Sequence, residues 1–128
     1  MQLELSVLPS HLAVCRLDAG TQPPAWALAG SFLSVSVTSE ETSVVCEEVR
    51  VPDGTQADTG WRAFKVAGPL DFSLTGILLA IAAPLAEAGV GIFAVSTYDT
   101  DYVLVKQDSL DRAVSALRSA GHIVVLPE

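Results

Sequence analysis

Three aspartates are the residues of this sequence whose type and spacing best suit chemistry. Asp99 and Asp101 stand two positions apart in STYDTDYVLV, residues 96–105, and Asp71 lies in GPLDFSLTG, residues 68–76. Paired carboxylates coordinate hard metal ions or serve as acid and base in catalysis. Neither segment contains a histidine, lysine or cysteine to complete such a site. We therefore expect no metal, no cofactor and no catalytic residue, and a small carboxylate- or metal-dependent enzyme is the weakest alternative.

Ligand binding without catalysis needs no further catalytic or metal-ligating group beside these aspartates. GPLDFSLTG leads into an expected helix, whose first N–H groups are unpaired and carry a partial positive charge that suits a carboxylate. A nearby aspartate neutralises an ammonium or guanidinium group. The alternative is that Asp71 or Ser73 only caps this helix and that Asp99 is only a turn residue, which is the favoured interpretation for Asp99. Asp101 begins an apolar strand, where an unpaired charge is costly, so these segments predict a zwitterionic ligand such as a free amino acid.

The second half of the chain alternates strand and helix patterns that would position these residues. In chain order the expected elements are a strand at 61–68, a helix at 74–88, strands at 90–96 and 102–105, a helix at 110–120 and a strand at 123–126. The strand at 90–96 is apolar on both faces, which is typical of a central strand covered by helices. Pro84 is an irregularity, because proline removes a backbone donor from a helix. The order β-α-β-β-α-β predicts an α+β, ferredoxin-like fold.

The first sixty residues contain a weaker version of the same plan. SVSVTSEETSVVCEE reads as a strand, an acidic turn and a second strand, and it aligns without gaps to AVSTYDTDYVLV, so that Ser43 falls opposite Asp101. A similar offset places LELSVL against RAFKVA, while the short AWALAG stands where the second half has a helix. We therefore expect a degenerate, strand-rich subdomain at 1–60 and a complete one at 61–128, joined by the loop 52–60 and packed as one compact unit.

Composition limits the classes of partner. The 128 residues carry a formal net charge of −8, which disfavours nucleic acid and anionic membrane surfaces. Half of the residues are hydrophobic, and that excess predicts a covered surface, most simply in a homodimer. Cys15 and Cys46 lie in apolar runs without metal-binding spacing, so packed thiols are favoured over a disulfide or a metal site. With no signal peptide visible at the start, a cytoplasmic location is expected.

One combination of segments points to a known family. GPLDFSLTG, PLAEAGV and STYDTDYVLV together resemble the ACT domains of the CASTOR type, named for the animal cytosolic arginine sensor; the resemblance is strong over about residues 61–121 and weaker through VTSEETSVVCEE. It implies a βαββαβ regulatory module that binds an amino acid at an interface between two units. The residues that it implies for the ligand site are Asp71, Phe72, Ser73, Thr75, Gly76, Ser96, Thr97, Tyr98, Asp101, Ser43 and Val44.

The resemblance also assigns roles within this site. It implies that the loop 68–76 holds the main-chain end of the ligand and that Asp101 meets a positive group. Thr100 and Phe72 depart from what an arginine pocket would need, so the ligand is left as an amino acid or a similar small zwitterion. The favoured hypothesis is a non-enzymatic, cytoplasmic, homodimeric regulatory protein. The main alternative is a structural or protein-interaction module with no ligand.

Overall fold

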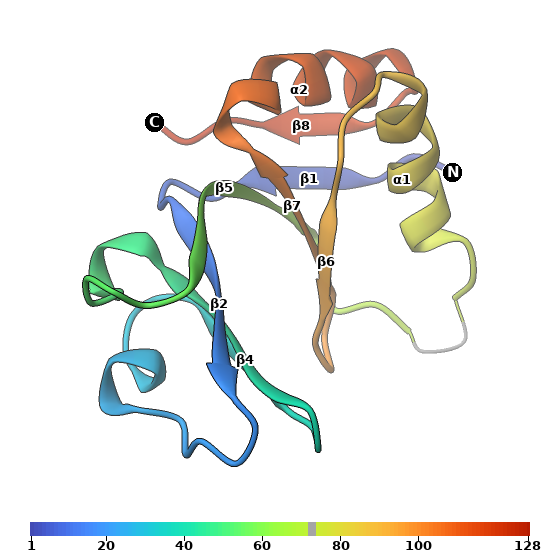
Figure 1. Cartoon of the computed structure of the whole chain (residues 1–128). Helices are drawn as coiled ribbons and strands as arrows, with labels where there is room; N and C mark the ends of the chain where they lie inside the picture. Colours follow the sequence, from blue (N-terminus) through green and yellow to red (C-terminus); the bar gives the residue numbers. More distant parts are fainter. Residues whose placement is uncertain (72–73) are drawn as a thin grey trace. The chain divides into compact units, whose positions relative to one another are not determined.

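The structure is a computed structural model that describes residues 1–71 and 74–128. Its contacts divide the chain into two compact units (Figure 1). The N-terminal unit is Ser10–Trp61, and the C-terminal unit combines Met1–Pro9 with Arg62–Glu128. The strands are β1 (Glu4–Val7), β2 (Leu12–Asp18), β3 (Leu33–Val37), β4 (Glu41–Glu47), β5 (Ala57–Val66), β6 (Phe93–Ser96), β7 (Asp101–Lys106) and β8 (Ile123–Val125). The α-helices are α1 (Ile77–Glu87) and α2 (Leu110–Ser119), and the 3-10 turns are η1 (Ala25–Leu28), η2 (Glu48–Arg50) and η3 (Gln107–Ser109).

The C-terminal unit confirms the predicted ferredoxin-like fold. Its elements β5, α1, β6, β7, α2 and β8 follow each other in the order β-α-β-β-α-β. The strands pair in the spatial order β6-β7-β5-β1-β8. Figure 1 shows α2 beside β8 and β1, with α1 next to it. Both helices place their apolar stripes in one core with the sheet, as the helical spacing of Ile77, Ile81 and Leu85 predicts.

Strand β1 corrects the expected equivalence between LELSVL and RAFKVA. Instead of forming part of the first repeat, β1 pairs antiparallel with β5, with Leu5 opposite Val66, and parallel with β8, with Leu5 opposite Val124. It therefore completes the sheet of the C-terminal unit between these two strands. The side chain of Leu5 is fully buried, because β1 contributes its apolar positions to the same core as the helices. Residues 1–9, which the expected boundary after residue 60 assigned to the first subdomain, group with residues 62–128.

Strand β6 was expected in the centre of the sheet, and that expectation is wrong. Within the described residues β6 pairs with β7 alone and forms an edge. Ala94 and Ser96 are exposed, while Phe93 and Val95 are half-buried. The neighbouring strand β7 lies between β6 and β5, and its residues Val103–Val105 are all buried. A continuous apolar run therefore marked a strand correctly but did not distinguish a covered strand from an exposed edge.

Helix α1 starts later than its apolar pattern suggested, and a side chain from outside the helix replaces the hydrogen bond that Pro84 cannot donate. The residue at the N-cap position is Gly76, with a φ of 78°, so neither Asp71 nor Ser73 occupies that position. Pro84 cannot donate a hydrogen bond to the carbonyl of Ala80, four residues earlier. The His122 side chain takes this place, with Nε2 lying 2.9 Å from the Ala80 oxygen. Nδ1 of the same ring accepts a hydrogen bond from the backbone N–H of Leu3 at 3.1 Å.

The N-terminal unit is strand-rich, as predicted. β4 pairs antiparallel with both β3 and β2, and the short η1 stands in place of a helix. Its small core consists of Ala13, Cys15, Ala27, Val44 and Cys46. Both cysteines are free and buried, as expected for packed thiols.

The two hairpin turns show that the ungapped alignment is offset by one residue. Val37 pairs with Thr42 at the end of the β3–β4 hairpin, and Ser96 pairs with Asp101 at the end of the β6–β7 hairpin. The structural counterpart of Asp101 is therefore Thr42, not Ser43. Thr42 is fully buried, and its hydroxyl donates to the carbonyl of Thr21 at 2.9 Å.

None of the helices formed by residues 1–71 and 74–128 has the length and apolar character needed to cross a membrane.

Candidate functional site

The loop after β5 is held against the turn of the β6–β7 hairpin. The backbone N–H of Leu70 donates to the carbonyl of Asp99 at 2.7 Å. The hydroxyl of Thr100 donates to the carbonyl of Val66, the last residue of β5, at 2.6 Å. Thr100 is 4% exposed, so its hydroxyl needs this acceptor inside the protein. These two hydrogen bonds connect the segments that contain Asp71 and Asp101.

Gly68 allows this close approach. A Cβ atom at this position would lie 3.0 Å from the Asp99 carbonyl oxygen and 3.1 Å from Cβ of Thr100. Any larger residue would push the loop away from the hairpin, because the first of these neighbours is a backbone atom. The function of Gly68 is therefore steric, and it acts together with the hydrogen bond of Thr100.

The hairpin turn is fixed by Thr97. Its backbone N–H donates to the carbonyl of Thr100 at 2.8 Å, and its hydroxyl oxygen lies 3.3 Å from the Thr100 N–H as acceptor. The side chain thus closes the turn on itself. With the turn fixed, Tyr98 is 81% exposed and Asp99 is also exposed.

The loop, the hairpin turn and the start of α1 enclose a cavity of about 260 Å³. This is slightly below the ~300–1,000 Å³ typical of drug-sized ligand sites, which suits a ligand of amino-acid size. The lining residues are Leu70, Asp71, Leu74, Gly76, Ile77, Leu78, Thr97, Tyr98, Asp99, Thr100 and Asp101. The cavity lies entirely within the C-terminal unit.

The predicted site residues fall into four groups. Asp71, Gly76, Thr97, Tyr98 and Asp101 line the cavity together. Thr75 and Ser96 are exposed beside it and are not part of its lining. Ser43 and Val44 belong to the N-terminal unit, and Phe72 and Ser73 lie outside the described residues.

Sequence reasoning missed several residues of this cavity. Thr100 was interpreted only as a departure from an arginine pocket, although its hydroxyl holds the loop against the hairpin. Its Thr type, at the start of an apolar strand, gave no signal of this role. Asp99 was favoured as a turn residue; it does occupy the turn, but it also lines the cavity. Leu70, Leu74, Ile77 and Leu78 supply apolar walls that the search for polar residues did not consider.

The cavity combines acidic residues with the N-terminus of α1. Three carboxylates line it, and its described lining contains no lysine, arginine or histidine. Asp101 is half-buried, and within the described residues its carboxylate has no hydrogen bond or ion pair. The N-cap residue of α1, Gly76, provides no side-chain acceptor for the first N–H groups of the helix. This arrangement attracts a cationic group at Asp101 and an anionic group at the helix end.

Metal binding has no comparable support in the geometry. Among residues 1–71 and 74–128, no three His, Cys, Asp or Glu side chains are grouped closely enough to hold a metal ion. Asp71, Asp99 and Asp101 share a cavity without forming such a group. The described lining offers aspartates, threonines, a tyrosine and apolar side chains, which suit electrostatic recognition and hydrogen bonding.

Comparison with known families decides the classification. The family model described as ACT domain matches residues 56–119, and a second model, described as an N-terminal domain, matches residues 10–54. The chain belongs to the ACT domain family. Among solved structures, a protein from Agrobacterium tumefaciens superposes with a TM-score of 0.94 at 39% identity, covering 100% of this chain and 96% of that one.

Two human proteins extend this ACT relationship. The cytosolic arginine sensor for mTORC1 subunit 1 is 36% identical over 59 residues, which are 45% of this chain and 18% of that protein. The protein CASTOR3P is 31% identical over 101 residues, covering 69% of this chain and 62% of that protein. The recognised resemblance to CASTOR-type ACT domains is therefore confirmed. The chain spans only about a fifth of the arginine sensor.

Proposed function

We propose that this ACT protein is a non-enzymatic regulatory module that binds a free amino acid or a similar small zwitterion. The ligand site is the cavity between the loop 68–76 and the β6–β7 hairpin. The main-chain carboxylate of the ligand lies at the N-terminus of α1, and its cationic group meets Asp101. As an extension of the proposal, the protein works in the cytoplasm as a homodimer.

The unpartnered carboxylate of Asp101 is the observation that carries this proposal. A half-buried charge without a partner is unfavourable on its own, and a bound cation removes that cost. The open N-terminus of α1 in the same cavity supports a ligand that has both signs of charge. The name of the arginine sensor, to which this chain is similar over 59 residues, supports an amino acid over other zwitterions.

The test is a thermal-melt screen against the twenty amino acids, with wild-type protein and Asp101→Asn. A ligand at one hundred times its dissociation constant adds about 2.7 kcal/mol to the free energy of unfolding, which raises the melting temperature by several degrees. We expect a shift with one amino acid or one chemical group of them, and at least about a tenfold loss of affinity in Asp101→Asn.

Asp108→Asn is the matched control, because Asp108 is exposed on η3, outside the cavity lining. It changes the net charge in the same way as Asp101→Asn and should bind like the wild type. A flat response from the folded wild-type protein to all twenty amino acids would contradict the proposal. That result would favour a protein-interaction module, for which the exposed Leu78 and Leu79 on α1 offer an apolar surface.

A further inference from the structure

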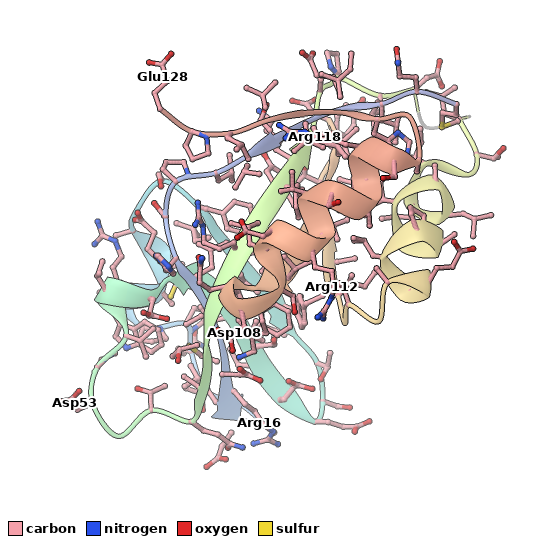
Figure 2. All side chains as sticks on the ribbon, turned by 90° about the horizontal axis from the view of Figure 1, so that it is seen from above. Arg16, Asp53, Asp108, Arg112, Arg118 and Glu128 are labelled. Atoms are coloured by element: carbon pink, nitrogen blue, oxygen red, sulfur yellow. The ribbon has the colours of Figure 1, made fainter. Side chains whose placement is uncertain are left out.

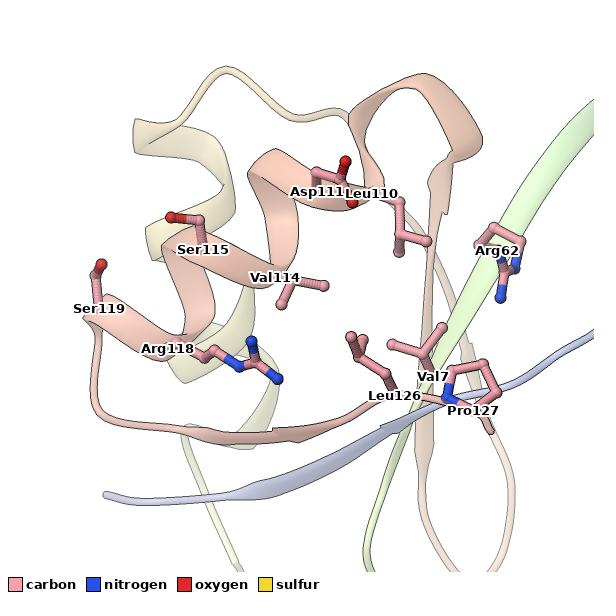
Figure 3. A pocket seen from close by; sticks show the side chains of 10 residues that line it. All are labelled: Val7, Arg62, Leu110, Asp111, Val114, Ser115, Arg118, Ser119, Leu126 and Pro127. Carbon is pink, nitrogen blue, oxygen red and sulfur yellow. The ribbon is translucent and has the colours of Figure 1, made fainter.

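A second and larger cavity lies in the C-terminal unit, away from the proposed amino-acid site. It has a volume of about 720 Å³ and lies between α2, the end of β1 and the residues after β8 (Figure 3). Its lining residues are Val7, Arg62, Leu110, Asp111, Val114, Ser115, Arg118, Ser119, Leu126 and Pro127. It shares no lining residue with the cavity at the β6–β7 hairpin. Its volume is within the ~300–1,000 Å³ range of small-molecule sites.

Arg62 is the reason to regard this cavity as a binding site. Arg62 is only 9% exposed, and its Nε–H is buried with no hydrogen-bond partner. The two terminal nitrogens donate to neutral oxygens only, Oε1 of Gln107 at 2.9 Å and the carbonyl of Leu8 at 3.0 Å. Arginine has five N–H donors and stays charged at any physiological pH. Within the described residues, this buried cation therefore has no carboxylate to balance it.

Buried charges in proteins are normally paired, because desolvating a cation costs several kcal/mol. An unpaired buried arginine therefore suggests a ligand that supplies the opposite charge. The cavity lining contains one carboxylate, Asp111, which forms no ion pair with Arg62 or Arg118. Figure 3 shows Arg118 entering from the opposite side of the cavity to Arg62. The chain has only seven lysines and arginines against fifteen acidic residues, so two arginines on one cavity form a local positive site. An anion is the ligand that this charge distribution attracts.

The remaining walls indicate what kind of anion fits. Val7, Val114 and Leu126 lie between the two arginines in Figure 3 and give the cavity an apolar surface. A bare phosphate ion would leave these side chains uncovered. A hydrocarbon body attached to a carboxylate covers them while its head group pairs with a guanidinium, often through two parallel hydrogen bonds.

We propose that this cavity is a second ligand site, which binds an organic carboxylate with an aliphatic body. The carboxylate pairs with Arg62, and Arg118 adds a second positive charge at the other end of the cavity. The body of the ligand packs on Val7, Val114 and Leu126. This proposal is independent of the amino-acid site, since the two cavities share no residue.

The test is a titration of the full chain with hexanoate, followed by 1H–15N correlation spectra that include the arginine Nε–H resonances. Chloride and phosphate at equal ionic strength are the comparison anions. We expect saturable shifts with hexanoate at the Arg62 Nε–H and at the backbone amides of Val114 and Arg118. Arg62→Gln should weaken binding at least about tenfold, because it removes a charge-assisted hydrogen bond.

A second variant tests the site without touching the buried arginine, in case Arg62→Gln fails to fold. Ser115 is exposed on the cavity wall, so Ser115→Asp should fold normally and weaken hexanoate binding several-fold by repulsion. Arg112→Gln is its control, because it also lowers the net charge by one and because Arg112 lies on the opposite side of α2 from Arg118 (Figure 2). Arg112→Gln and Asp101→Asn should both bind hexanoate like the wild type.

Three results would overturn the second site. The first is an absence of saturable shifts with hexanoate, or equal shifts with chloride or phosphate. The second is a response confined to Thr97–Asp101, which would place hexanoate in the amino-acid site instead. The third is equal hexanoate affinity in Ser115→Asp and Arg112→Gln. None of these results bears on the amino-acid screen, which reports on Asp101.

Discussion

At the scale of single residues, Cys15 and Cys46 illustrate how burial changes chemistry. Both thiols belong to the apolar core of the N-terminal unit, on the neighbouring strands β2 and β4. Burial raises the pKa of the Cys15 thiol from 9.0 to about 11, and the neighbouring Cys46 adds to the effect. Burial also raises the pKa of Cys46. Because the thiolate is the reactive form, these cysteines are protected from oxidation and alkylation in the folded protein.

This protection gives a prediction about pH and reactivity. The folded-state pKa of Cys15 lies above that of the unfolded chain, so the unfolded state loses its proton first as the pH rises. The protonated Cys15 thiol therefore makes its full contribution to the free energy of unfolding below about pH 9, and this contribution is lost between pH 9.0 and about 11. Urea unfolding should show a falling midpoint in this range, and the fall should be smaller in Cys15→Ala. A thiol reagent such as an aromatic disulfide should react slowly with native protein and fast in denaturant; fast reaction with native protein would contradict the prediction.

Residue types predicted part of the cavity and left part of it undetected. Asp101 could be singled out from sequence because a charge at the start of an apolar strand needs an explanation. Thr100 could not, because threonine is an ordinary strand residue and its partner, the carbonyl of Val66, is 34 positions away. Arg62 was equally hidden, since a single arginine in a strand pattern gives no sign of being buried.

At the scale of elements, α1 shows how a flaw in a local pattern is repaired from elsewhere. Proline within a helix leaves the carbonyl four residues earlier without its donor. In α1 this carbonyl belongs to Ala80, and His122, which directly precedes β8, supplies the missing donor. The same ring accepts the N–H of Leu3 just before β1. His122 is 6% exposed, so its two ring nitrogens link three elements inside the protein.

A double-mutant cycle between His122 and Pro84 tests this repair. His122→Leu leaves two buried backbone groups without partners and should lower the free energy of unfolding by about 2–6 kcal/mol, from ~1–3 kcal/mol for each group. In the Pro84→Ala background, residue 84 supplies its own N–H to Ala80, so His122→Leu should cost about 1 kcal/mol less. The measurement is urea unfolding of the four proteins. An equal cost of His122→Leu in both backgrounds would show that the ring does not substitute for the missing donor.

At the scale of the whole molecule, the sequence predicted the fold through its local periodicities and failed at long-range pairing. Helical spacing and apolar runs identified β5, α1, β6, β7, α2 and β8 in their correct order. The insertion of β1 between β5 and β8 was not predictable from these patterns, because its partners are about sixty and 120 residues away. The edge position of β6 was missed for the same reason: strand order depends on contacts that a local pattern does not contain.

The exposed apolar residues of α1 support the proposed homodimer and give the last prediction. On α1, Leu79 is 69% exposed and Leu78 is 36% exposed. Exposed apolar side chains on one helix are typical of a surface covered by a partner. Leu79→Glu should weaken the dimer by more than about tenfold, because burying an unpaired carboxylate at an interface costs well over ~1.4 kcal/mol. Val49→Glu is the matched control, because Val49 is 91% exposed on η2 and is also changed from an apolar residue to glutamate.

Sedimentation velocity at micromolar concentration should show dimers for the wild type and Val49→Glu and monomers for Leu79→Glu. A monomeric wild type would remove the dimer from the proposal, and a dimer unaffected by Leu79→Glu would move the interface away from this face of α1.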